Sequence, residues 1–142
     1  MNRVGGVLLF ALLMVAALVV TQAKLTPQER GALLQNVNLV LLLNDAEDIA
    51  HAKQGHFVAF AELVKSGALE EAARGPYARI FTKLDLKQET EPLPGFDLGI
   101  VVSADGAAYK LSLAQKSKCG KVFFSDQKKQ IYLGQPLECP AD

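Results

Sequence analysis

The sequence predicts an α+β fold in which helices come first and a four-stranded antiparallel meander follows. Apolar residues recur at helical spacing through the first half of the chain, and from residue 98 onward they alternate with a period of two. A polar, Pro-rich connection, Glu89–Gly95, separates the two patterns. We therefore expect one domain over residues 24–142, with the apolar face of the sheet packed on a long helix.

The first 23 residues have the layout of a secretory signal peptide. Arg3 gives a basic start, Val4–Val20 is an uncharged apolar run, and Thr21-Gln22-Ala23 has small residues at its first and third positions. This layout predicts export to the periplasm or out of the cell. Residues 4–23 are also long enough to cross about 30 Å of hydrocarbon, so retention as a membrane anchor is the alternative.

The charge balance argues against nucleic acid as a partner. The chain has 15 Lys and Arg residues against 15 Asp and Glu residues, and the basic ones are scattered rather than gathered into a stripe. A nearly neutral domain lacks the basic surface that binds phosphates. We also find no catalytic constellation and no phosphate-binding Gly loop, so we expect a protein that is not an enzyme and needs no cofactor.

The two cysteines, Cys119 and Cys139, are expected to form a disulfide bond. An even number of cysteines in an exported domain is more often a bridge than a pair of free thiols. A bridge at this place would fasten the C-terminal tail to the start of the third predicted strand.

The segment after the leader opens with a capping box, Thr26-Pro27-Gln28-Glu29, which predicts a helix start. The helix should run to Lys53 or Gln54, and Gly55 suits the left-handed residue that ends it. In its middle, Leu39-Val40-Leu41-Leu42-Leu43 wraps most of the circumference. Such a stretch must be covered on several sides, either by its own domain or by a partner protein.

Shorter helical patterns follow the long helix. One contains Phe57, Phe60, Leu63 and Val64, the next covers Ala68–Ala73, and residues 77–92 are partly helical in pattern.

Four strands are expected after residue 95. They are a first strand with Leu98, Ile100 and Val102 on one face, a return strand with Tyr109, Leu111 and Leu113 on one face, a third at Lys121–Ser125 and a fourth at Gln130–Leu133. The first two are joined by a hairpin at Ala104-Asp105-Gly106-Ala107, because Asp-Gly accepts the positive φ of tight turns. Phe123 and Phe124 are adjacent, so one faces outward and is a candidate contact residue for a protein partner.

Only one group of residues suggests a metal. His51 and His56 are the two histidines of the chain, and Asp48 lies three residues before the first. These three residues could ligate zinc, which would make the chain a small exported metal-binding protein or enzyme. The spacing of five between the histidines does not place them on one helix face, so a solvated helix end is the alternative that we favour.

Four stretches together resemble type IV pilins and pseudopilins. Asn44–Phe57 is similar to the end of the pilin helix and its Gly-aromatic step, and Phe96–Tyr109, Cys119–Asp126 and Ile131–Gly134 are similar to pilin-like sheets. The resemblance implies a long helix, a meander and a C-terminal disulfide loop. It also implies a structural or binding role in the bacterial envelope, or a membrane-anchored part of a secretion or pilus system.

Two features depart from the pilin pattern. If Gly6 ended a pilin leader, the fifth residue after it would be Ala11, where pilins carry Glu. In addition, Thr26-Pro27 begins a new helix where a pilin continues one unbroken helix from the membrane. Both departures favour a soluble exported relative over a filament subunit.

Overall fold

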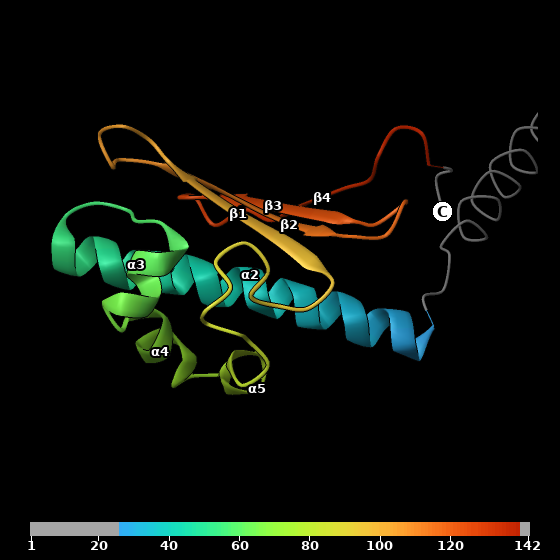
Figure 1. Cartoon of the computed structure of the whole chain (residues 1–142), viewed down its shortest axis with the longest axis horizontal. Coiled ribbons are helices and arrows are strands. Elements are labelled where there is room, and N and C mark those ends of the chain that lie inside the picture. The colour runs from blue at the N-terminus through green and yellow to red at the C-terminus, as the bar shows by residue number, and fades with distance from the viewer. Residues whose placement is uncertain (1–25, 140–142) are drawn as a thin grey trace, which may run out of the picture.

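The structure is a computed structural model that describes residues 26–139. The segment predicted to be a signal peptide or anchor lies outside the described residues. Within them, the helices are α2 (Pro27–Gln54), α3 (Phe60–Lys65), α4 (Ala68–Ala73) and α5 (Ala78–Phe81), and the strands are β1 (Phe96–Val102), β2 (Tyr109–Gln115), β3 (Val122–Asp126) and β4 (Tyr132–Gly134). Helices first and an antiparallel sheet second is the predicted α+β class (Figure 1).

Both ends of α2 form as the sequence predicts. The backbone N–H of Glu29 donates to Thr26 Oγ1 at 3.2 Å, and the Thr26 N–H donates to Glu29 Oε2 at 2.7 Å. At the other end, Gly55 has φ 80° and its N–H donates to the carbonyl of His51. Over residues 26–139, no helix is long and apolar enough to span a membrane.

The second helix begins later than its apolar spacing suggests. Phe57 and Val58 lie outside the helix, because their backbone N–H groups bind elsewhere: that of Phe57 donates to the carbonyl of Gly106 at 2.9 Å, and that of Val58 to Glu47 Oε2 at 3.1 Å. The apolar pattern at Phe57 reflects burial between α2 and the β1–β2 hairpin. Within residues 77–92, only α5 is helical.

The sheet has the order β1-β2-β3-β4, with every neighbouring pair antiparallel. Its inner face includes the row in which Leu98, Leu113 and Phe123 are paired across three strands. The predicted alternation of buried and exposed side chains in β1 and β2 is confirmed. The ends of β3 and β4 differ from the predicted ends by one or two residues.

The β1–β2 hairpin is wider than a two-residue Asp-Gly turn. Among the hairpin residues 103–108, only Gly106 has a positive φ, 69°. The Asp105 side chain accepts hydrogen bonds from the Ser103 hydroxyl at 2.6 Å and the Ala107 N–H at 3.0 Å. A Cβ at Gly106 would lie 2.7 Å from the Cβ of His56. Glycine is therefore required here both for its φ and for the close approach of the α2–α3 loop.

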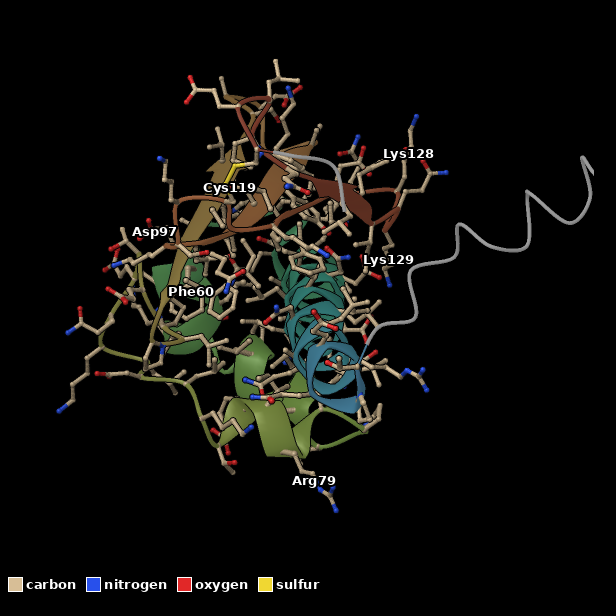
Figure 2. The ribbon with its side chains drawn as sticks, turned by 90° about the vertical axis from the view of Figure 1, so that its right-hand side faces the viewer. Phe60, Arg79, Asp97, Cys119, Lys128 and Lys129 are labelled. Atoms are coloured by element: carbon tan, nitrogen blue, oxygen red, sulfur yellow. A yellow bond between two sulfur atoms is a disulfide. The ribbon has the colours of Figure 1, made fainter. Side chains whose placement is uncertain are left out.

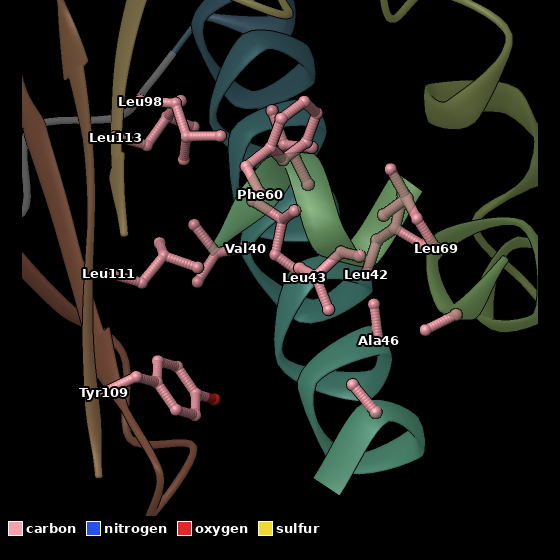
Figure 3. Packing of buried hydrophobic residues seen from close by; sticks show 14 of the residues in the cluster. Val40, Leu42, Leu43, Ala46, Phe60, Leu69, Leu98, Tyr109, Leu111 and Leu113 are labelled. Carbon is pink, nitrogen blue, oxygen red and sulfur yellow. The ribbon is translucent and has the colours of Figure 1, made fainter. Parts of the chain in front are cut away.

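Helix α2 lies between the sheet and the helices α4 and α5 (Figure 1). Leu39, Val40, Leu42 and Leu43 have no exposed surface. Figure 3 shows Val40 directed toward Leu111 of the sheet, while Leu42 lies toward Leu69 of α4. Burial inside the domain therefore accounts for these four side chains, which offer no surface to a partner protein. Leu41, the fifth residue of the stretch, is only partly buried.

Candidate functional site

A chain of buried polar side chains joins α2 to the sheet. The Tyr109 hydroxyl donates to Asn44 Oδ1 at 2.8 Å, and Asn44 Nδ2 donates to Ser125 Oγ at 2.8 Å. All three residues are at most 4% exposed. Burial raises the pKa of Tyr109 above its ordinary value, so its hydroxyl keeps its proton and acts as a donor. The chain fixes how α2 sits on β2 and β3, since a shift of either strand would leave buried groups unpaired.

Glu47 lies one helical turn beyond Asn44 and is fully buried. Its Oε2 accepts the Val58 N–H, and Oε1 has no hydrogen-bond partner among residues 26–139. Burial raises the pKa of Glu47 to about 7; the Val58 hydrogen bond opposes this shift and the charge of Asp48 adds to it. Perturbed carboxyls of this kind are common in active sites. Glu47, however, has no exposed surface that a substrate could reach.

Sequence reasoning did not identify this polar group. Asn44 and Glu47 each follow an apolar residue of the buried helix face, Val40 and Leu43, by four positions. A polar residue at a core position of the helical repeat is the signal that could have identified them. Their partners cannot be inferred in this way, because Ser125 lies 81 residues away from Asn44.

The structure does not bring together the three candidate metal ligands, Asp48, His51 and His56. The ring of His51 packs against Phe57, with centroids 4.5 Å apart, and Nδ1 of His56 lies 3.0 Å from the carbonyl of Gln54. Asp48 is paired with Lys129. In the part of the chain that the structure describes, no three His, Cys, Asp or Glu side chains are grouped as metal ligands.

Lys129 connects the β3–β4 turn to α2. Its Nζ lies 3.3 Å from Asp45 Oδ1 and also pairs with Asp48 Oδ2. The hydrogen bond to Asp48 raises the pKa of Lys129. This pairing fastens the turn that precedes β4 to the helix, close to the buried Asn44–Ser125 pair.

The predicted disulfide between Cys119 and Cys139 is present, with Cα atoms 5.6 Å apart (Figure 2). The bridge holds the C-terminal tail against the loop before β3. Disulfides persist in oxidising compartments, so this bond suggests an exported environment.

The outer face of the sheet has exposed apolar side chains. Phe123 is 2% exposed and points into the core, whereas Phe124 is 45% exposed and points outward. Beside it on β4, Tyr132 is 56% exposed, and Val101 on β1 is 69% exposed. Between them lie the small residues Gly99 and Ser112, which are in register with Phe124 and Tyr132. We call Val101, Phe124 and Tyr132 the outer-face cluster.

None of the helices in residues 26–139 covers the outer face, because α2 and the shorter helices all lie on the other side of the sheet (Figure 1). The ring of Phe124 lies over Gly134, because a Cβ at that position would be 3.1 Å from Phe124 Cε2. The outer-face cluster therefore lies uncovered beside the small residues Gly99, Ser112 and Gly134.

Comparison with known proteins does not place the chain in a family: no family model, no curated protein and no solved structure matches it.

Proposed function

We propose that this chain is a non-enzymatic, exported protein of the bacterial envelope that binds a protein partner through the outer-face cluster. The observation that carries the proposal is the outward orientation of Phe124 and Tyr132 on a face of the sheet that no described helix covers. Aromatic residues are enriched where proteins meet partners, and a group of exposed apolar side chains is typical of such surfaces.

The buried polar groups support the non-enzymatic part of the proposal. Asn44, Tyr109 and Ser125 are hydrogen-bonded to one another inside the core, and Glu47 is enclosed there as well. Their arrangement serves the packing of α2 on the sheet. We retain the resemblance to pilins as part of the proposal, since the long helix, the meander and the C-terminal bridge that it implies are features of this fold.

Intact mass spectrometry of the protein from its native host tests export. We expect a chain that begins at Lys24, because the small residues at positions 21 and 23 suit signal cleavage. We also expect it to be two hydrogens lighter than the reduced mass, because Cys119 and Cys139 are bridged. A chain that begins at Val7 or keeps the whole leader would instead favour the membrane-anchored, pilin-like alternative. A reduced mass would contradict the exported environment.

Photo-cross-linking tests the outer-face cluster. With p-benzoylphenylalanine in place of Phe124, irradiation of intact cells should give a discrete adduct with one envelope protein. The same probe in place of Arg79 is the matched control, since Arg79 is exposed but lies on the far side of α2 from the sheet (Figure 2). The adduct at position 124 should be lost when Tyr132 is replaced by Lys. Equal adducts at positions 124 and 79, or none at 124, would contradict the proposal.

A further inference from the structure

The first half of β1 is protected at the edge of the sheet, and the second half is not. The Lys116 N–H donates to the Gly95 carbonyl, and the Ser103 N–H donates to the Ala108 carbonyl. The backbone N–H and C=O groups of the odd-numbered residues of β1 therefore point toward β2, and those of the even-numbered residues point away from the sheet at its edge. The outward N–H of Leu98 donates to the Thr90 carbonyl at 2.7 Å.

The outward N–H groups of Ile100 and Val102 have no such loop partner among residues 26–139. Residues 98–102 also contain no charge and no proline, the features with which proteins usually prevent pairing at an edge. This half of β1 is therefore a short, unprotected apolar edge.

The other edge of the sheet, at β4, is of matching length. The Gln115 N–H donates to the Lys121 carbonyl, so the backbone groups of the odd-numbered residues of β3 point toward β2 and those of the even-numbered residues point toward β4. Tyr132 and Gly134, which pair with Phe124 and Val122, are therefore the residues of β4 whose backbone groups bond to β3. The backbone groups of Leu133 then face outward. β4 has only three residues, about as many as the unprotected half of β1 can pair.

The two edges also agree in direction and in face. β4 runs antiparallel to β1 within the meander, so a second copy in the same orientation presents β4 antiparallel to β1 of the first. Ile100 points to the helix side of the sheet, as does Leu133, which is paired with Phe123. When Leu133 pairs with Ile100 of a second copy, Tyr132 comes next to Val101.

Charge complements this register. The same alignment brings the turn that carries Lys128 alongside the turn that carries Asp105 of the second copy. Both side chains are exposed, and neither forms an ion pair among residues 26–139. Asp97 lies on β1 and Lys128 next to β4, and Figure 2 shows them at opposite edges of the sheet. One molecule can therefore use both edges at once.

We propose that β4 of one copy pairs with β1 of a second copy and extends the sheet from one molecule into the next. The contact is head-to-tail, so it closes into a ring or continues into an open chain according to the rotation between copies. It uses backbone groups at the sheet edges and does not depend on the partner proposed for the outer-face cluster.

The test uses the full-length chain with its N-terminal segment, expressed in cells with p-benzoylphenylalanine in place of Tyr132. Irradiation should give a dimer in which the probe is joined to a peptide that contains Val101 of the second copy. The probe in place of Arg79 should give no such dimer. A probe at position 132 that joins only other proteins, or a different segment of this chain, would overturn the proposal.

Charge reversal tests the register. Lys128→Glu alone and Asp105→Lys alone should each lower the dimer yield by about three-fold, because like charges then meet. Cells that make both variants together should recover the dimer, because the two reversed charges then face each other. Asp105 also accepts hydrogen bonds within its turn, so Asp105→Asn is the control that keeps an acceptor there and removes only the charge. It should lower the yield less than Asp105→Lys does. Yields that are the same for all of these variants would overturn the register.

Discussion

Replacing Leu43 by Ala is expected to lower the free energy of unfolding by about 2–5 kcal/mol. Leu43 has no exposed surface and lies in the middle of α2, where its side chain packs in the core. The loss combines the transfer free energy of the missing carbons with the cost of the cavity that remains. Urea denaturation followed by far-UV circular dichroism measures it.

Leu34 provides the matched control on the same helix. It is 56% exposed, so Leu34→Ala should change the free energy of unfolding by about 0.5 kcal/mol or less. The comparison holds the residue type and the helix constant and varies only the burial. Equal losses for the two variants would mean that the buried face of α2 is not the one described above.

The stability of the protein is expected to fall as the pH rises from about 4.5 to about 7. The folded pKa of Glu47 is about 7, raised from 4.5, so the folded state holds a proton that the unfolded state has already released. The stabilisation is complete below pH 4.5 and is lost as the pH passes the folded pKa. A shift of this size corresponds to on the order of 3 kcal/mol.

Glu47→Gln isolates this effect. The amide keeps an oxygen that can accept the Val58 N–H, and it does not titrate, so the decrease in stability between pH 5 and pH 8 should be largely removed. Glu70→Gln is the control, since Glu70 is exposed on α4 and its replacement should leave the pH dependence as it is. The thermal unfolding midpoints of the original protein and the two variants, measured at pH 5 and pH 8, give the pH dependence of each. A pH dependence that is identical in the Glu47→Gln variant and the original would refute this assignment.

Periodicity was sufficient to predict the architecture. The capping box at Thr26, the glycine at Gly55 and the alternation through β1 and β2 are all local signals, and each lies where the sequence indicates. The bridge between Cys119 and Cys139 was also predictable, because two cysteines that follow a segment with the layout of a signal peptide are more often bridged than free.

Features that depend on long-range contacts could not be predicted in this way. Phe57 fits an apolar helical pattern, yet it is not helical, because the carbonyl of Gly106 in a hairpin about 50 residues later accepts its N–H. The burial of Glu47 likewise depends on Val58 and on the sheet above it. The outward orientation of Phe124 was predicted only as one of two alternatives, since the register of β3 against β2 decides it.

The order in which the parts of the core are synthesised has a consequence for export. The hydrogen-bond partners of Asn44 are Tyr109 and Ser125, which follow it in the chain by 65 and 81 residues. The strands that carry them also cover the apolar side of α2. A chain that crosses a membrane from its N-terminus therefore delivers its most apolar helix well before the sheet that covers it. Until β3 has crossed, the apolar side of that helix lacks its cover, which favours aggregation. Cys139 follows β3 in the chain, so its bridge to Cys119 forms later still. Under the proposed export, we expect newly translocated chains to depend on a holding chaperone during this interval.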